Sequence, residues 1–383
     1  MYICNTLKFS DIYGHVSLKK KLVEQVNNNR ISHAQLFYGN EGSNALPMAI
    51  AYAQYINCTN KQEFDSCGKC ASCNKYQQYI HPDLHFSFPF IVSKADDIEL
   101  SDDMLPLFRK SLIDSPQLTI NEWIEIAKIE NKTLNIPIKE CRNIIKKLSF
   151  KPYEAEYKVV IMWLPEYVGK EGNVLLKSIE EPAPNTLFIL VTENPTLILP
   201  TILSRTQLLK INLYSREEIK DYLITQLSIE ESVSNNIALM TNGNIHKAKI
   251  LSEKIDYSFL SGFKTFLNDC YQGNSTAMFN WAESFSEKGK DDAKHFLNYI
   301  LELLRYSLIV EHRSISTEVA PEEEKIIVTL SKLLNLKGRE TIYKAINQAF
   351  FEIDRNGNLK FIIINLSLSL KNNFLRQPKA QSN

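Results

Sequence analysis

The chain has 383 residues with 44 basic and 44 acidic side chains. This even balance gives no overall field that would indicate a nucleic-acid partner, although local basic patches are still possible. The length predicts two or three domains, each able to bury its own core. There is no N-terminal signal pattern and no apolar run of membrane-spanning length, so we expect a cytoplasmic protein with no membrane partner.

The first recognisable elements are a helix over Leu18–Val26 and a strand within residues 31–39, both predicted from apolar spacing. Residues 39–46 follow, in the position of a phosphate-binding loop with the pattern G-x-x-x-x-G-K-[ST]. Gly39 keeps the first glycine and Gly42 lies inside the loop. The glycine, lysine and hydroxyl positions that close the pattern hold Asn44, Ala45 and Leu46.

A phosphate loop needs its lysine to reach the β- and γ-phosphates and its hydroxyl to bind Mg²⁺. Both side chains are substituted here. Helix N-terminal amides attract anions even without them. We nevertheless expect a turn that only packs strand against helix, and no bound ATP.

Four of the seven cysteines crowd into one segment with the spacing C-x₈-C-x₂-C-x₂-C. They are Cys58, Cys67, Cys70 and Cys73. Four thiolates at this spacing can close a tetrahedral zinc site with no open position for catalysis. The alternative is a set of free or buried thiols, but the flanking residues are polar. We therefore expect a structural Zn²⁺ in a module over residues 58–73. The remaining cysteines are expected to be small core residues: Cys4, Cys141 and Cys270.

Residues 84–135 are locally acidic and show helical patterns over Leu105–Ile113 and Ile120–Ile129. We assign them no function and expect a solvated elaboration of the domain. Apolar spacing predicts a further helix that begins at Ile138.

The stretch from Lys158 to Arg205 holds two short apolar runs, 159–164 and 187–192, on either side of a helical segment. This pattern predicts a buried parallel βαβ unit. Pro182 should end the helix. The acidic side chains of Glu180 and Glu181 oppose the helix dipole there. They are either a solvated helix end or charges compensated by tertiary partners.

A new unit begins near residue 214. Ser215 with Glu218 forms a capping box, Ser228 with Glu231 repeats it, and Gly243 suits a helix C-terminus. Apolar residues then recur at helical spacing from residue 255 to residue 375. We expect a disordered tail over residues 376–383.

The run Leu175-Leu176-Lys177-Ser178-Ile179-Glu180-Glu181-Pro182, followed by a strand and Ser204-Arg205, resembles the clamp-loader subunits of bacterial DNA polymerase III. These belong to the AAA+ superfamily. The four-cysteine module and His81-Pro82-Asp83 also match subunits of the gamma and delta-prime type. The resemblance implies an α/β fold followed by an all-α part. An AAA+ parallel-sheet domain would span residues 1–213, a small helical lid 214–254 and a helical collar 255–375, with 84–135 as an insertion.

In ATP-hydrolysing relatives the central strand ends in an Asp-Glu pair that serves the metal and the attacking water. Trp163 and Leu164 stand at those positions here, and Glu166 lies past the strand end. Thr192-Glu193-Asn194 falls on the first sensor, and His246 replaces the arginine of the second. The resemblance therefore implies a non-hydrolysing subunit of the delta-prime type.

Arg205 falls on the clamp-loader Ser-Arg-Cys motif together with Ser204, and arginine forks onto phosphate oxygens. The resemblance implies an arginine finger that acts on a neighbouring subunit, whereas the alternative is a surface salt bridge. The implied partners are the gamma/tau and delta subunits and, through the complex, the sliding clamp and primer-template DNA. Two other functions remain open: an ATP-hydrolysing gamma/tau-type motor, and a zinc-dependent nucleic-acid-binding protein outside replication.

Overall fold

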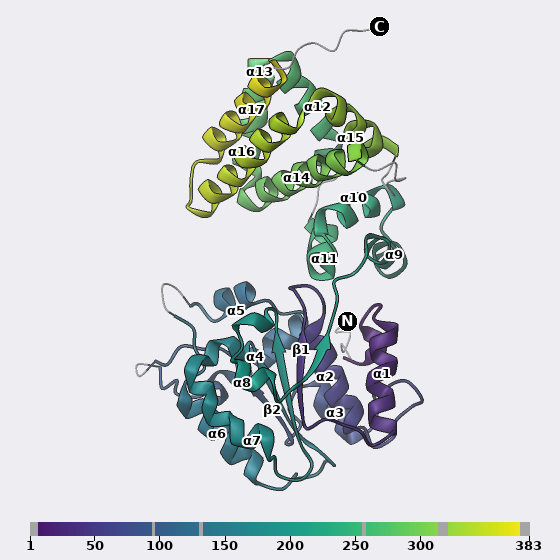
Figure 1. Cartoon of the computed structure of the whole chain (residues 1–383), viewed down its shortest axis with the longest axis vertical. Coiled ribbons are helices and arrows are strands. Elements are labelled where there is room, and N and C mark those ends of the chain that lie inside the picture. Colours follow the sequence, from purple (N-terminus) through teal and green to yellow (C-terminus); the bar gives the residue numbers. More distant parts are fainter. Residues whose placement is uncertain (1–6, 94–95, 130–132, 255–257, 313–320, 376–383) are drawn as a thin grey trace. The chain divides into compact units, whose positions relative to one another are not determined.

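The computed structural model in Figure 1 describes most of the chain: residues 7–93, 96–129, 133–254, 258–312 and 321–375. The chain divides into two compact units, Met1–Tyr214 with Gly243–His246, and Ser215–Asn242 with Lys247–Asn383. Cys4 and the predicted tail lie outside the described residues. Among the described residues, no helix is both long and apolar enough to cross a membrane.

A five-stranded parallel sheet organises the first unit, in the order β2-β3-β4-β1-β5. The strands are β1 Ala34–Tyr38, β2 Leu84–Ser87, β3 Lys158–Trp163, β4 Thr186–Thr192 and β5 Gln207–Lys210. The predicted parallel βαβ unit is confirmed, because β3 and β4 are parallel neighbours with Ile161 opposite Ile189. Strands β2 and β5 were not predicted from the sequence. Since β2 pairs with β3, residues 84–87 are an edge strand of the sheet.

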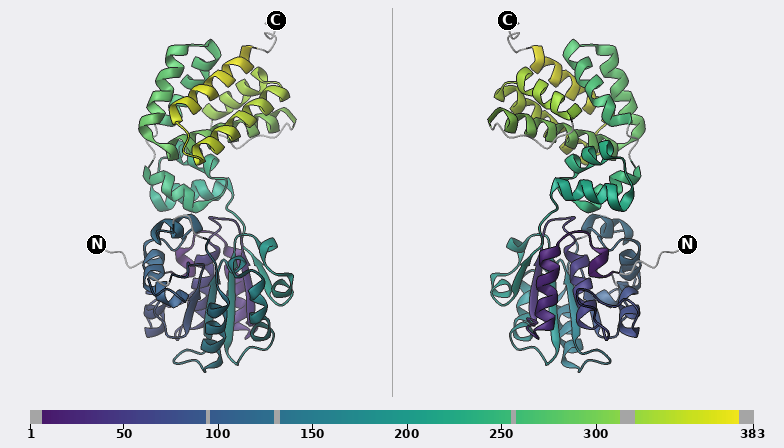
Figure 2. Two further views of the ribbon diagram at one scale, coloured as in Figure 1. Left: turned by 90° about the vertical axis from the view of Figure 1, so that its left-hand side faces the viewer. Right: turned by 90° about the vertical axis from the view of Figure 1, so that its right-hand side faces the viewer.

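Helices cover both faces of this sheet, which makes the α/β layer expected from the sequence (Figure 2). One face packs against α1 (Val16–Asn27), α2 (Ala45–Ile56) and the insertion. The other packs against α6 (Ile138–Ser149) and the helical segment between β3 and β4. Successive side chains of β3 point to opposite faces of the sheet, as in any strand. Both faces are covered, so the side chains on each side are buried.

The insertion contributes a buried aromatic cluster, so the expectation of a solvated elaboration is wrong. It carries α4 (Ser101–Asp114) and α5 (Ile120–Ile126). Phe88, Phe108 and Trp123 are fully buried, and the rings of Phe88 and Phe108 stack with centroids 3.9 Å apart. The acidic residues, in contrast, lie toward the surface, where lysines of α6 pair with two of them, Glu99 and Asp102.

The helical segment before Pro182 has two parts. A 3-10 helix, η2 (Pro165–Leu175), is interrupted at Gly169 by a positive φ of 58°, and α7 (Leu176–Glu180) follows it. The helix ends before Pro182, as predicted. The chain then passes through β4, η3 (Pro195–Leu197) and α8 (Pro200–Leu203) before it reaches β5. Helix α3 (Ala71–Gln77) and η1 (Phe9–Asp11) complete the unit.

The described part of the second unit is helical throughout, which confirms the all-α prediction. Its helices are α9 Arg216–Leu227, α10 Glu231–Thr241, α11 Ile245–Lys254, α12 Ser258–Gln272, α13 Ser275–Lys288, α14 Lys290–His312, α15 Pro321–Leu333, α16 Leu336–Asp354 and α17 Leu359–Leu375. The capping box of Ser215 and Glu218 is confirmed. The second predicted box is wrong, because Ser228 ends α9 in a left-handed conformation and Glu230 precedes α10.

Candidate functional site

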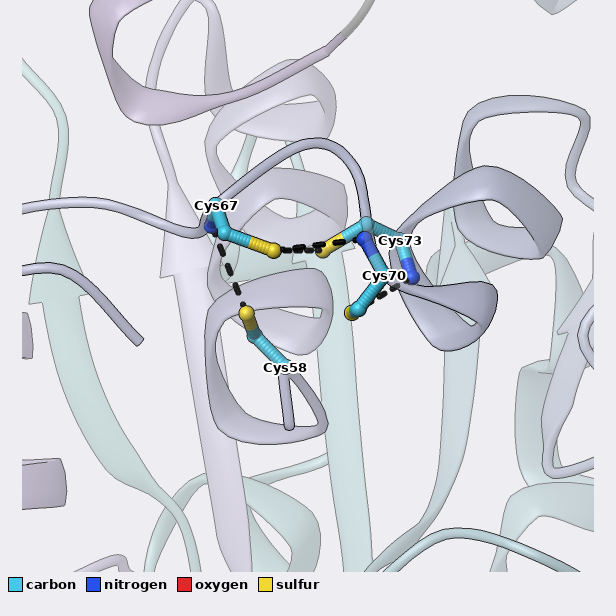
Figure 3. Close-up of side chains that lie close together, drawn as sticks. All are labelled: Cys58, Cys67, Cys70 and Cys73. Carbon is cyan, nitrogen blue, oxygen red and sulfur yellow. Dashed lines mark hydrogen bonds between the residues drawn. The ribbon is translucent and has the colours of Figure 1, made fainter. Parts of the chain in front are cut away.

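The structure brings the four cysteines of the 58–73 module together. Cys58 follows α2, Cys67 and Cys70 lie on the connecting loop, and Cys73 lies in the first turn of α3. Their sulfurs all lie within 4.8 Å of one another and turn toward a common centre (Figure 3). The Sγ atoms of Cys67 and Cys73 are 3.9 Å apart, far longer than a disulfide bond.

This donor set fits a tetrahedral metal. Zn–S bonds of 2.3 Å place sulfurs about 3.8 Å apart in a regular tetrahedron. Backbone amides already point at the sulfurs: the amide of Cys67 donates to Cys58 at 3.3 Å, and those of Cys70 and Cys73 donate to Cys67 and Cys70 at 3.3 and 3.4 Å. Such bonds stabilise thiolates, so the four cysteines could hold a metal ion.

Without a cation the four thiols cannot all be ionised. Burial raises the pKa of Cys58 and of Cys73 above the usual value. Burial also acts to raise the pKa of Cys70, but hydrogen bonds from Thr59 and Cys73 outweigh it and lower that pKa to about 6. A metal must therefore displace protons from the buried pair, which makes its binding weaker at low pH.

A buried asparagine that the sequence analysis missed joins this module to the core. The amide nitrogen of Asn57 donates to the hydroxyl of Tyr76 at 2.7 Å and to the carbonyl of Tyr157 at 2.8 Å. Its oxygen accepts the Tyr157 amide at 3.0 Å. Because all three partners are buried or half-buried, the helix that carries Cys73 is held against the start of β3.

Side chains of the same unit occupy the degenerate phosphate loop. Asn44, in a left-handed conformation with φ 66°, donates through its side chain to the hydroxyl of Tyr214 at 2.8 Å. Asn244 donates to the carboxylate of Glu41 at 3.1 Å. It packs so closely on Gly42 that a Cβ there would lie 2.0 Å from its Oδ1 atom. Positions 42 and 44, which would lie beside a phosphate in an active loop, are therefore in contact with Asn244 and Tyr214 of the same chain.

The cavity that remains beside the loop measures about 40 Å³. Residues 39–47, the ends of β3 and β4, and Gln117–Thr119 of the insertion line it. Both residues at the expected Asp-Glu positions, Trp163 and Leu164, are buried in this wall. Small-molecule pockets usually measure about 300–1,000 Å³, whereas a water occupies about 30 Å³. The enclosed space has room for a water molecule and is smaller than a usual small-molecule pocket.

Glu166 lies beside the expected first sensor. The Thr192 hydroxyl donates to its Oε1 at 3.0 Å, while its Oε2 is buried with no hydrogen-bond partner among the described residues. Burial raises the pKa of Glu166 to about 7. The third departure predicted from the sequence, His246, is buried and bonds to Glu122 of the insertion at 2.7 Å.

Glu166→Gln is expected to stabilise the protein at high pH. The folded state binds the Glu166 proton more tightly than the unfolded state, so ionisation above the unfolded pKa of about 4.5 costs stability until the folded pKa is passed. A neutral amide removes this cost. We expect a gain of about 1–3 kcal/mol near pH 8 and almost none near pH 4, measured by denaturant unfolding. Equal gains at both values would contradict the assignment.

Arg205 is half-exposed just after α8. Its Nε donates to Glu180, and its Nη1 donates to the Thr201 carbonyl at 2.9 Å and to the Ser204 hydroxyl at 3.2 Å. The charge of Glu180 at the end of α7 is thus compensated by a tertiary partner, one of the two alternatives left by the sequence. The same contact shows that, within this chain, Arg205 forms a surface salt bridge.

Comparison with known proteins shows which family the chain belongs to. Residues 14–215 match a family model described as "DNA polymerase III, delta subunit". Over 239 residues the chain is 26% identical to the DNA polymerase III subunit delta' of Bacillus subtilis, covering 62% of this chain and 59% of that protein. It is also 26% identical over 258 residues to subunit tau of the same organism, covering 66% of this chain and 38% of that protein.

The chain spans about six-tenths of the delta' relative's length. Among solved structures, a DNA polymerase III gamma subunit-related protein from Thermotoga maritima shares 15% identity over 93% of this chain and 99% of its own. Its TM-score of 0.39 is too low to support an inference. The family match covers more than half of the chain. The chain therefore belongs to the DNA polymerase III family that this model describes, among the clamp-loader subunits.

Proposed function

We propose that this chain is a non-hydrolysing clamp-loader subunit of the delta-prime type. It works in the cytoplasm as part of the complex that loads the sliding clamp onto primer-template DNA. Its own contribution is structural: it joins the gamma/tau and delta subunits and presents fixed residues to them. The second unit, with its bundle of helices, is the proposed surface for assembly.

The observation that carries this proposal is the state of the phosphate loop. The loop has no lysine and no hydroxyl at the positions that bind phosphate and Mg²⁺, where Ala45 and Leu46 stand. The cavity beside it, about 40 Å³, is smaller than a usual small-molecule pocket. Tau is also among the relatives, so family membership alone leaves an ATP-hydrolysing motor open. The loop and the cavity favour the non-hydrolysing alternative.

The four cysteines would hold a structural Zn²⁺. All four protein ligands are present, so the metal would have no open position for water or substrate. Its proposed role is to fix the loop between α2 and α3, whose few apolar residues cannot form a core. A zinc-dependent nucleic-acid-binding protein outside replication is the weaker alternative, because the family match extends well beyond the module.

Arg205 would act on a neighbouring subunit rather than within its own chain. It is half-exposed, and its contacts with Glu180 and Ser204 hold the guanidinium at the surface. In the assembled loader it would exchange the Glu180 carboxylate for a phosphate oxygen of ATP bound by a gamma/tau subunit. A guanidinium there would stabilise the negative charge that develops during phosphoryl transfer.

Titration calorimetry with Mg-ATP tests the non-hydrolysing role directly. We expect no measurable heat of binding and no ATP turnover by the purified chain, because the lysine, the hydroxyl and the acidic pair are all replaced. A gamma/tau subunit from the same source, measured in the same buffer, provides the positive control. Micromolar affinity for ATP would overturn the proposal and favour the motor alternative.

Reconstitution tests the proposed partners. The chain is mixed with gamma/tau and delta subunits from its own source, and the products are separated by size-exclusion chromatography with mass detection. We expect one complex that contains all three types of subunit. If the chain elutes alone under conditions in which gamma/tau and delta associate, it is not a subunit of that loader.

A further inference from the structure

The insertion carries a tightly capped helix, α5, whose N-terminal end lies beside the degenerate loop. Thr119 and Glu122 cap the N-terminus of α5 reciprocally: the Glu122 amide donates to Thr119 Oγ1 at 3.3 Å, and the Thr119 amide donates to Glu122 Oε2 at 2.8 Å. The Thr119 hydroxyl also donates to Oε2, at 2.9 Å. Trp123, the next residue, is fully buried and donates to the Pro89 carbonyl at 2.8 Å. The backbone of this turn is therefore fixed, and Glu122 Oε1 remains for another partner.

That partner is His246, which is 124 residues away in the sequence. Its Nε2 lies 2.7 Å from Glu122 Oε1, and its Nδ1 lies 3.4 Å from Gln117 Oε1. Both ring nitrogens thus lie near side-chain oxygens, and the shorter contact, to Glu122, anchors the imidazole. Partial burial acts to raise the pKa of the Glu122 carboxyl. The hydrogen bonds from His246 and Thr119 outweigh it and hold the pKa below its usual value.

Two further contacts hold the segment Gly243–His246 against the rest of the first unit. The Tyr214 amide donates to the Gly243 carbonyl at 3.1 Å, and Asn244 bonds to Glu41 of the loop. Gly243 has a φ of 80°, and a Cβ at this position would lie 2.2 Å from the Tyr214 carbonyl oxygen. Only glycine permits such an approach. The segment is therefore bound at three successive points by side chains and backbone, one of them provided by the insertion.

We propose that the insertion acts as a built-in ligand for this segment, with the carboxylate of Glu122 as an internal anion that binds His246. Residues 117–119 form part of the wall of the small cavity, and Glu122 binds the segment that leads into α11. The segment then stays docked on the first unit without any nucleotide. This gives the insertion a function, and it deepens the non-hydrolysing role proposed above, on which it rests.

Hydrogen exchange measured by mass spectrometry on the full chain tests this proposal. Glu122→Gln removes the carboxylate of this contact and His246→Gln removes its imidazole, and we expect peptides that cover residues 243–250 to exchange on the order of tenfold faster in both variants. Glu125→Gln makes the same change of charge on an exposed residue of α5 and should exchange like the wild type. Peptides from β1 and β4 should be unaffected in all three variants.

His246→Gln also separates loss of the contact between Glu122 and His246 from damage to the helix cap, because it leaves Thr119 and Glu122 intact. Faster exchange in residues 117–126 of Glu122→Gln alone, with wild-type exchange in His246→Gln, would overturn the proposal. Wild-type exchange at residues 243–250 in both variants would also overturn it. Adding Mg-ATP to the wild type tests the underlying function separately. Slower exchange in residues 39–46 would show nucleotide binding and contradict the non-hydrolysing role, whatever the variants show.

Discussion

Replacing Cys73 by serine is expected to abolish metal binding and to unfold the module around α3. Cys73 is fully buried, and its sulfur lies 3.9 Å from that of Cys67. A hydroxyl is a poor zinc ligand, so the remaining three thiols would lose the closed tetrahedral set. Structural Zn²⁺ contributes about 10–16 kcal/mol to the folding of isolated zinc-finger peptides. Here we expect a loss of several kcal/mol, concentrated in residues 58–77.

Elemental analysis of protein purified without chelator should find one Zn²⁺ per wild-type chain and none in Cys73→Ser. Limited proteolysis should cut the variant within residues 58–77, and chelator treatment of the wild type should reproduce these cuts. Cys141→Ser is the matched control, because Cys141 is buried on α6 outside the cluster and should keep the full metal content. Wild-type protein with almost no metal, or full occupancy in Cys73→Ser, would refute the zinc site.

The elements predicted correctly from the sequence are those whose signal is local. The strands β3 and β4 are continuous apolar runs because both faces of the sheet are covered, and the helical spacing of the second unit is equally direct. The strands β2 and β5 were missed because they are four residues each and lie at the edges of the sheet. Only one of the four residues of β5 is buried, and the buried strand β2 has its apolar run interrupted by His85 and Ser87, so neither sequence carries a continuous apolar signal.

The insertion was misread for a different reason. Five of its acidic residues are clustered between positions 96 and 103, whereas its buried rings are spread from Phe88 to Trp123 and meet only in the tertiary structure. The capping pattern of Thr119 and Glu122 was readable in the sequence, but not the partner of Glu122. The contact between Glu122 and His246 spans 124 residues, and the hydrogen bond between Asn44 and Tyr214 spans 170, so neither has a local signature in the sequence.

The cysteine spacing was sufficient to predict the cluster because all four ligands come from one short segment. The site around Arg205 shows the limit of such reasoning. The sequence left two alternatives for Glu180 and two for Arg205, and one contact between these residues bears on both. The salt bridge explains the acidic helix end. The salt bridge does not by itself exclude a second use of the guanidinium in an assembly. Both side chains remain more than a third exposed to solvent.

Arg205→Ala is expected to leave the subunit folded and able to assemble, but to lower DNA-stimulated ATP turnover of the reconstituted loader at least tenfold. Exposed ion pairs contribute about 0–1 kcal/mol, so loss of the contact with Glu180 should not unfold the chain. Arginine fingers supplied by a neighbour contribute about 10³–10⁵ in rate in GTPases. Arg205→Lys should recover only part of the loss, because lysine lacks the planar fork.

Glu180→Gln separates the two uses of the guanidinium. It breaks the same salt bridge but keeps Arg205, so a trans-acting finger predicts wild-type or faster turnover, while a purely structural pair predicts the same loss as Arg205→Ala. Arg142→Ala, at an exposed position of α6, controls for removal of a surface arginine from the same unit. Turnover and complex formation are measured for each variant in the same reconstituted loader. If Arg205→Ala and Glu180→Gln reduce turnover equally, Arg205 serves the end of α7; if neither does, the ATP sites of the loader do not use it.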